Sequence, residues 1–148
     1  MSDTPISKKM TILFLCTGNS CRSQMAEGWA RHLRAVDFDV YSAGIEKHGV
    51  NPLAIEVMAE AGVDISAQES TLISELPQQV FDYVVTLCDH ANEACPYFPA
   101  RIKRIHHGFA DPPKLAAKAA SEEGKLEPYR QVRDQIRDFV AGLPDSCE

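Results

Sequence analysis

The sequence lacks a long hydrophobic run and an excess of positive charge. Its longest uninterrupted apolar stretch, Ile12 to Cys16, is far shorter than the roughly 18 residues that a membrane-spanning helix needs. Residues 1–9 are polar and lack the apolar core of a signal peptide, so we expect a flexible N-terminal tail there. Fifteen Lys and Arg residues against 21 Asp and Glu residues give a net charge of -6, which disfavours contact with nucleic acid and anionic lipid. We therefore expect a cytoplasmic protein that binds neither nucleic acid nor membranes.

The sequence also lacks the even, dense set of cysteines that is typical of small secreted domains. It has five cysteines in 148 residues, a length sufficient for one domain with its own hydrophobic core. In a reducing compartment such thiols are inert, bind a metal or take part in redox catalysis. We expect a single domain over residues 1–148 that is a monomer, and its thiols are Cys16, Cys21, Cys88, Cys95 and Cys147.

No internal repeat is visible, and strand-like runs alternate with helical patterns. Apolar or β-branched runs predict strands over Met10–Cys16, Val40–Ala43, Phe81–Leu87 and Arg101–His106. Apolar residues at helical spacing predict helices over 23–33, 52–61 and 129–143, whereas 114–125 is an exposed helix or an insertion. Strands separated by helices favour a parallel sheet, so the fold class is α/β, with three α/β/α layers and a four-stranded parallel sheet. In such sheets, ligands bind at the carboxyl ends of the strands.

The segment from Cys16 to Ser23 combines a thiol at the end of a buried strand with a tight turn, an arginine and the start of a helix. Inward-facing backbone amides and a helix N-terminus bind anions, and Arg22 adds a planar guanidinium that can contact two oxygens of one anion. The same donors favour the thiolate form of Cys16, which makes it a candidate nucleophile. The substrate-binding residues expected from this loop are Thr17, Gly18, Asn19, Ser20, Cys21, Arg22 and Ser23. The alternative is a buried cysteine beside an ordinary turn.

Two further cysteines follow the third predicted strand. Cys88 ends that strand, and Cys95 lies seven positions later, so a disulfide between them would close a short loop. A structural zinc site is the competing interpretation, but such sites usually space their ligands by two to four residues. Cys21 is expected to shape the loop, and Cys147 to be a passive thiol near the acidic terminus.

An aspartate follows the fourth predicted strand, in the sequence Asp111-Pro112. A carboxyl group held beside a bound anion can protonate a departing oxygen, so Asp111 is the candidate general acid. The alternative is a solvated aspartate in a turn before proline. His106 and His107 precede it and receive no functional role.

At these residues the sequence resembles the low-molecular-weight tyrosine phosphatase superfamily, whose members carry Cys-x5-Arg-Ser on the first strand-to-helix turn. Segments 24–29, 41–45 and 48–52 resemble the thioredoxin-coupled arsenate reductases of that superfamily. The resemblance implies a low-molecular-weight phosphatase-like fold and reduction of arsenate to arsenite in arsenic detoxification. It also implies a disulfide relay through Cys16, Cys88 and Cys95 that thioredoxin regenerates, with Asp111 as the acid.

The resemblance further implies no bound cofactor other than a potassium ion beside the loop. The matching residues are Asn19, Glu27 and the carbonyl of Ser42, followed by Glu69 and Thr71 where some relatives carry Thr and Asp. Two other functions remain open: a phosphatase for phosphotyrosine or small phosphate esters, and a non-catalytic thiol module that binds arsenite or a metal. The superfamily's phosphatases usually follow Asp-Pro with a tyrosine that lines the substrate cleft, whereas this chain has Pro113.

Overall fold

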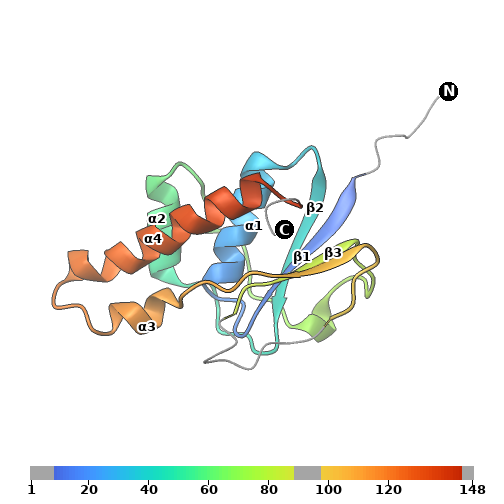
Figure 1. Ribbon diagram of the computed structural model, residues 1–148. Coiled ribbons are helices and arrows are strands. Elements are labelled where there is room, and N and C mark those ends of the chain that lie inside the picture. The colour runs from blue at the N-terminus through green and yellow to red at the C-terminus, as the bar shows by residue number, and fades with distance from the viewer. Residues whose placement is uncertain (1–8, 89–97, 145–148) are drawn as a thin grey trace.

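The computed structural model describes residues 9–88 and 98–144 (Figure 1). Four strands form one parallel sheet in the order β2-β1-β3-β4. Their bounds are Met10–Cys16 for β1, Phe38–Gly44 for β2, Tyr83–Thr86 for β3 and Lys103–His106 for β4. In the register of the sheet, Leu15 of β1 lies between Ala43 of β2 and Thr86 of β3. The carboxyl ends of these strands, and the loops that follow them, therefore meet at one edge.

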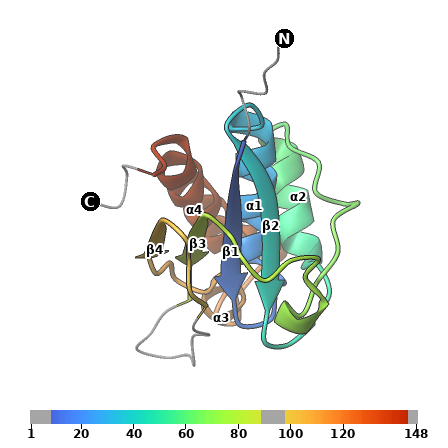
Figure 2. The same cartoon turned by 90° about the vertical axis from the view of Figure 1, so that its right-hand side faces the viewer.

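Helices cover one face of the sheet, as Figure 1 and Figure 2 show from two directions. They are α1 (Arg22–Leu33), α2 (Pro52–Glu60) and α4 (Glu122–Ala141), and the short α3 (Pro112–Ala116) packs against α4. The start of α2 follows from its residue types: Pro52 occupies the first turn, and Asn51 Oδ1 accepts hydrogen bonds from the amides of Leu53 and Ala54. Gly62, with a φ of 87°, ends the same segment in the left-handed region.

Alternating side chains of the central strand enter two separate hydrophobic cores. Ile12 and Phe14 of β1 pack with the helices, whereas Leu13 and Leu15 face the opposite side. On that second side they pack with Leu76, Phe81, Val84 and Phe98, next to the short 3-10 helix η1 (Ile73–Glu75). Because β1 is buried on both faces, its sequence is a continuous apolar run. With α1, α2 and α4 on one face of the sheet and η1 with its flanking residues on the other, the predicted three-layer α/β/α fold with a four-stranded parallel sheet is confirmed.

The last helix is longer than the sequence pattern indicated. The prediction placed its start at Tyr129, because the apolar positions at helical spacing were found between Tyr129 and Leu143. In the structure α4 begins at Glu122, where the side chain of Ser121 accepts a hydrogen bond from the Gly124 amide, and Pro128 lies inside the helix. The segment 114–125, expected to be an exposed helix or an insertion, is therefore the end of α3, a turn and the first residues of α4.

Strand boundaries differ from the sequence pattern by a few residues. The second strand is longer than predicted, since it begins at Phe38, and the third and fourth are shorter. Within residues 9–88 and 98–144, no helix has both the length and the apolar character needed to cross a bilayer.

Candidate active site

A cavity of about 280 Å³ lies at the carboxyl edge of the sheet, around the loop that follows β1. Cys16 is the last residue of β1, and Arg22 is the first residue of α1, so the loop between them joins a buried strand directly to a helix N-terminus. The loop residues that line the cavity are Cys16, Thr17, Gly18, Ser20, Cys21 and Arg22, and His48, Asp111 and Pro113 complete the described lining. The structure thus brings the predicted nucleophile, the predicted arginine and the predicted acid to one cavity.

Arg22 is held in place by the loop that follows β4. Its side chain is 4% exposed, and its Nη1 donates a 3.0 Å hydrogen bond to the carbonyl oxygen of Phe109. The amide of Phe109 in turn donates to the carbonyl of Leu87, just after β3. This orients a buried guanidinium at the cavity, where its charge and its remaining donors can act on a bound anion.

Asp111 lies beside Arg22, with 3.7 Å between Asp111 Oδ1 and Arg22 Nη2. It precedes α3, but its side chain makes no capping hydrogen bond, and it remains 29% exposed. A carboxyl group that lines the cavity and is not used as a helix cap can exchange a proton with both the solvent and a bound anion. The position fits the general-acid role better than that of a solvated turn residue.

Asn19 and Ser23 were predicted to bind substrate. Both are buried, and neither is among the residues that line the cavity. Asn19 has a φ of 47°, in the left-handed region that asparagine tolerates better than most residues. Its Nδ2 donates to Ser23 Oγ at 2.8 Å and to Ser42 Oγ at 3.0 Å, and its Oδ1 accepts from the Thr71 amide at 2.7 Å. Two segments far apart in the sequence, around Ser42 and Thr71, are thus tied to the turn of the loop.

The backbone of Asn19 is tied down as well. Its carbonyl oxygen accepts hydrogen bonds from Gln24 Nε2 at 3.0 Å and from Ser70 Oγ at 2.7 Å. Gln24 is completely buried and accepts a hydrogen bond from Gln68. The side chain and the carbonyl oxygen of Asn19 thus make hydrogen bonds to five other residues. These bonds hold the loop in its shape.

The described cysteines fall into two groups. Cys16 and Cys21 are buried thiols that form no disulfide, and burial, followed by the negative charge of Asp111, raises the pKa of the Cys21 thiol far above its usual range. Cys21 therefore stays a neutral thiol, in agreement with a loop-shaping role. Cys88 is completely buried and disulfide-bonded. It directly follows Leu87, whose amide donates to the Leu15 carbonyl, so Cys16 and Cys88 follow neighbouring positions of adjacent strands.

Two other cysteines lie outside the described residues. They are Cys95, predicted to act in a relay, and Cys147, predicted to be passive. Among the described residues, no cluster of three or more His, Cys, Asp or Glu side chains could hold a metal ion.

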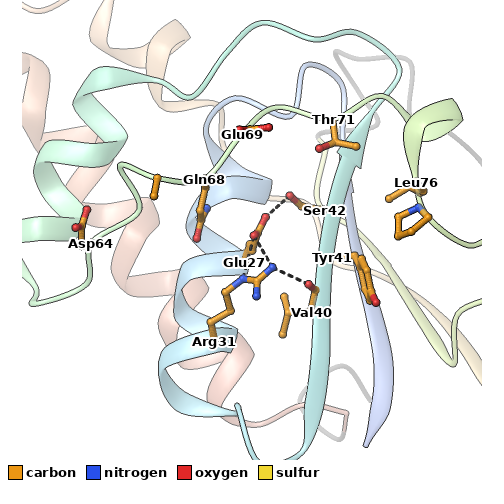
Figure 3. Close-up of a pocket in the computed structure, with 12 residues that line it drawn as sticks. Glu27, Arg31, Val40, Tyr41, Ser42, Asp64, Gln68, Glu69, Thr71 and Leu76 are labelled. Carbon is orange, nitrogen blue, oxygen red and sulfur yellow. Dashed lines mark hydrogen bonds and ion pairs between the residues drawn. The ribbon is translucent and has the colours of Figure 1, made fainter.

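Two of the residues predicted to bind potassium, Glu27 and Ser42, form a chain of hydrogen bonds with Arg31 (Figure 3). Ser42 Oγ donates to Glu27 Oε1 at 2.5 Å, while Glu27 Oε2 pairs with Arg31 at 2.9 Å. Arg31 also donates to the carbonyl of Val40. Because the Thr71 amide requires an oxygen acceptor, the Asn19 side chain must turn its oxygen to that amide and its nitrogen to Ser42. Asn19 Nδ2 therefore faces Ser42 and the Arg31 guanidinium faces Glu27, while potassium binding through Asn19, Glu27 and the carbonyl of Ser42 stays a prediction.

Two contributors to the site carried no signal in the sequence pattern. The carbonyl of Phe109, which holds Arg22, is a backbone group, and residue type does not reveal it. His48 lies in the segment 48–52 that carries the family resemblance. Its place on the cavity wall, however, depends on the path of the chain after β2, which the sequence pattern does not show. That path is fixed by the amide of His48, which donates to the carbonyl of Gly18.

Comparisons with known proteins agree with this geometry. The family model described as low molecular weight phosphotyrosine protein phosphatase matches residues 11–147. An arsenate reductase of Halalkalibacterium halodurans is 54% identical over 128 residues, which cover 86% of this chain and 90% of the relative. A solved arsenate reductase in the phosphate binding state has a TM-score of 0.69 at 32% identity and covers 94% of this chain and 99% of its own. A Corynebacterium glutamicum thioredoxin-dependent arsenate reductase, 24% identical over 90% of this chain and 61% of its own, shares the fold with a TM-score of 0.60.

Proposed function

Since the chain belongs to the low molecular weight phosphotyrosine protein phosphatase family, and its curated relatives are arsenate reductases, we propose that it reduces arsenate to arsenite through a thiol relay. One observation carries the proposal. A cysteine thiol that forms no disulfide lies at an anion-sized cavity together with a buried arginine and a carboxyl group, and a second cysteine follows the adjacent strand.

The reaction starts with arsenate in the cavity. Arg22 and the loop amides bind its oxygens, and the Cys16 thiolate attacks arsenic to form a sulfur–arsenic bond. The arsenate hydroxyl leaves as water after it takes a proton from Asp111. Arsenic is still pentavalent at this stage, because one ligand has replaced another.

Reduction takes place in the second step. The Cys88 thiolate attacks the sulfur of Cys16, a disulfide forms, and the electron pair of the sulfur–arsenic bond remains on arsenic, which leaves as arsenite. Cys95 then attacks Cys88 and frees Cys16, and a dithiol of the thioredoxin class reduces the Cys88–Cys95 disulfide. In the structure Cys88 takes part in a disulfide and Cys16 does not, which supports the assignment of Cys88 to the relay.

The relay needs no bound cofactor, and the positive charge beside the loop comes from Arg31. Its ion pair with Glu27 balances the carboxylate that would otherwise attract a cation, and Ser42 connects that carboxylate to Asn19. The reaction consequently proceeds equally well in sodium and in potassium salts of the same ionic strength. In the cell the protein acts as a cytoplasmic monomer in arsenic detoxification, with thioredoxin as its redox partner.

Phosphate-ester hydrolysis is the competing activity, because the same cavity holds any tetrahedral oxyanion. Pro113 lines the cavity where the superfamily's phosphatases usually carry a tyrosine, so a phosphotyrosine ring loses that aromatic contact. A non-catalytic thiol module is the other alternative, and it needs neither Arg22 nor Asp111 at the cavity.

One pair of rate measurements separates these functions. Arsenate-dependent NADPH oxidation with thioredoxin and its reductase is compared with hydrolysis of p-nitrophenyl phosphate by the same protein. We expect arsenate turnover to be much the faster, and Cys88→Ser to abolish it while leaving any hydrolysis unchanged. Faster hydrolysis would identify a phosphatase, and arsenite binding without either turnover would identify a thiol module.

A further inference from the structure

The wall of the anion cavity contains a histidine that the mechanism above does not use. His48 follows β2 and is fastened to the anion loop by two backbone hydrogen bonds. The amide of Glu46 donates to the carbonyl of Thr17 at 2.9 Å, and the amide of His48 donates to the carbonyl of Gly18 at 3.1 Å. The segment that carries His48 is therefore held in a fixed position relative to the loop.

The imidazole ring lies directly against Gly18. A β-carbon added at Gly18 would come within 2.4 Å of His48 Nδ1, so the ring occupies the space that any larger residue at position 18 would need. Both residues line the cavity. The glycine thus lets a histidine ring reach the wall of the anion site.

The two ring nitrogens of His48 have different surroundings. Nε2 lies 2.7 Å from Glu46 Oε1, which fixes a proton on Nε2, while Nδ1 lies nearest the anion loop. In the neutral ring Nδ1 is a hydrogen-bond acceptor, which repels an oxyanion. In the protonated ring Nδ1 becomes a donor, and the carboxylate of Glu46 stabilises that positive charge.

The charges that face His48 show what a second cation would do. Besides Glu46, the ionisable side chains on the described cavity wall are Cys16, Cys21, Asp111 and Arg22, and Arg22 is the permanent cation among them. The neighbouring Lys47 points elsewhere, because it pairs with Glu75. A doubly charged oxyanion and a Cys16 thiolate together exceed the charge of one guanidinium, so another positive group at the wall favours binding.

We propose that His48, in its protonated form, is a second oxyanion-binding residue that donates from Nδ1 to an arsenate oxygen, and that Glu46 positions it. This inference deepens the proposed function and rests on it for the identity of the substrate. It assigns the pair to binding rather than to chemistry, since neither residue exchanges a proton with the leaving oxygen.

The test compares three variants with the wild type between pH 6 and pH 9. His48→Gln removes the charge but keeps a polar side chain, Glu46→Gln removes the positioning carboxylate, and His32→Gln is the matched control at an exposed histidine that contacts Trp29. Steady-state kcat and KM for arsenate are measured in the thioredoxin-coupled assay. The kcat and KM of each variant are divided by the wild-type values at the same pH, so that the titration of arsenate itself cancels.

At pH 6.5 we expect His48→Gln to raise KM for arsenate roughly tenfold, the loss of one charge-assisted hydrogen bond, and to leave kcat within about twofold. The proposal requires the protonated ring, so the difference in KM between the variant and the wild type should shrink as the pH rises toward 9. Glu46→Gln should also raise KM for arsenate at pH 6.5, because it removes the carboxylate that positions the ring, and His32→Gln should change nothing. An unchanged KM in His48→Gln at every pH, or a loss confined to kcat, overturns the inference.

A second measurement keeps the inference independent of arsenate turnover. Inorganic phosphate is used as the probe, and its binding is read as protection of Cys16 from alkylation by iodoacetamide. We expect His48→Gln to need roughly tenfold more phosphate at pH 6.5 for the same protection. Equal protection in the variant and the wild type overturns the role of His48 even if arsenate is reduced. Weakened protection without any arsenate turnover instead overturns the proposed function alone.

Discussion

Asn19→Ala is the substitution that tests most severely how the loop is held in shape. It deletes the three side-chain hydrogen bonds to Ser23, Ser42 and Thr71, each with a net contribution of about 1 kcal/mol. It also places alanine at a φ of 47°, which costs about 1 kcal/mol more than glycine does. The expected loss is about 3 to 5 kcal/mol, a large part of the roughly 5 to 15 kcal/mol that keeps a typical domain folded.

Urea unfolding measures this loss, with fluorescence of the single tryptophan as the signal. Trp29 is 4% exposed, and its indole donates to the carbonyl of Arg133 in α4, so its emission reports the helix packing. Asn19→Gly loses the same hydrogen bonds without the backbone cost, so it should be about 1 kcal/mol more stable than Asn19→Ala. Asn51→Ala serves as the reference variant, because it removes a helix cap and should lower the free energy of unfolding by about 1 kcal/mol. The reasoning fails if Asn19→Ala costs less than the cap does, or if the glycine variant is the weaker of the two.

Three further predictions concern ionisation and charge. Iodoacetamide at pH 8 should modify Cys16 well before Cys21, because burial raises the pKa of the Cys21 thiol, and peptide mass spectrometry would contradict this if both were labelled at equal rates. The hydrogen bond from Arg130 lowers the pKa of Glu60 below its ordinary 4.5, so this pair stabilises the fold above about pH 4.5 and its contribution is lost as the pH falls through the folded-state pKa. Glu60→Gln should therefore flatten the acid decline of Tm, and an unchanged decline would exclude the pair as a cause. Arg31→Ala should make turnover depend on potassium, which the wild type should not need, and a variant that responds equally to sodium and potassium would refute the role given to that ion pair.

The sequence pattern was sufficient for the parts of the fold in which neighbouring residues determine the structure. The prediction for β1 matches the observed strand, Met10–Cys16, because a strand buried on both faces must be continuously apolar. The turn after β1 was predicted from its glycine and asparagine. The helix after that turn was predicted from apolar residues at helical spacing. The start of α4 was wrong by seven residues, because packing against α1 and α3 outweighs the local effect of Pro128.

The sequence also indicated which side chains meet at the cavity but not the groups that hold them. Cys16, Arg22 and Asp111 are chemically distinctive residue types, and the strand-end rule places them together. Asn19, by contrast, is fixed by partners 23 and 52 positions away, and that pairing exists only after the chain has folded. Arg22 is fixed by a carbonyl group, which every residue possesses.

The relay through Cys16 and Cys88 is the central claim, and a single turnover without thioredoxin tests it most directly. Fully reduced Cys95→Ser protein is mixed with arsenate, arsenite is quantified, and the disulfides are mapped by mass spectrometry under non-reducing conditions, with Cys21→Ser as the control. The account predicts one arsenite per protein molecule and a disulfide that joins Cys16 to Cys88 in Cys95→Ser, and the same yield of arsenite from Cys21→Ser. Arsenite release without that disulfide, or a disulfide that joins Cys16 to Cys21, would contradict it.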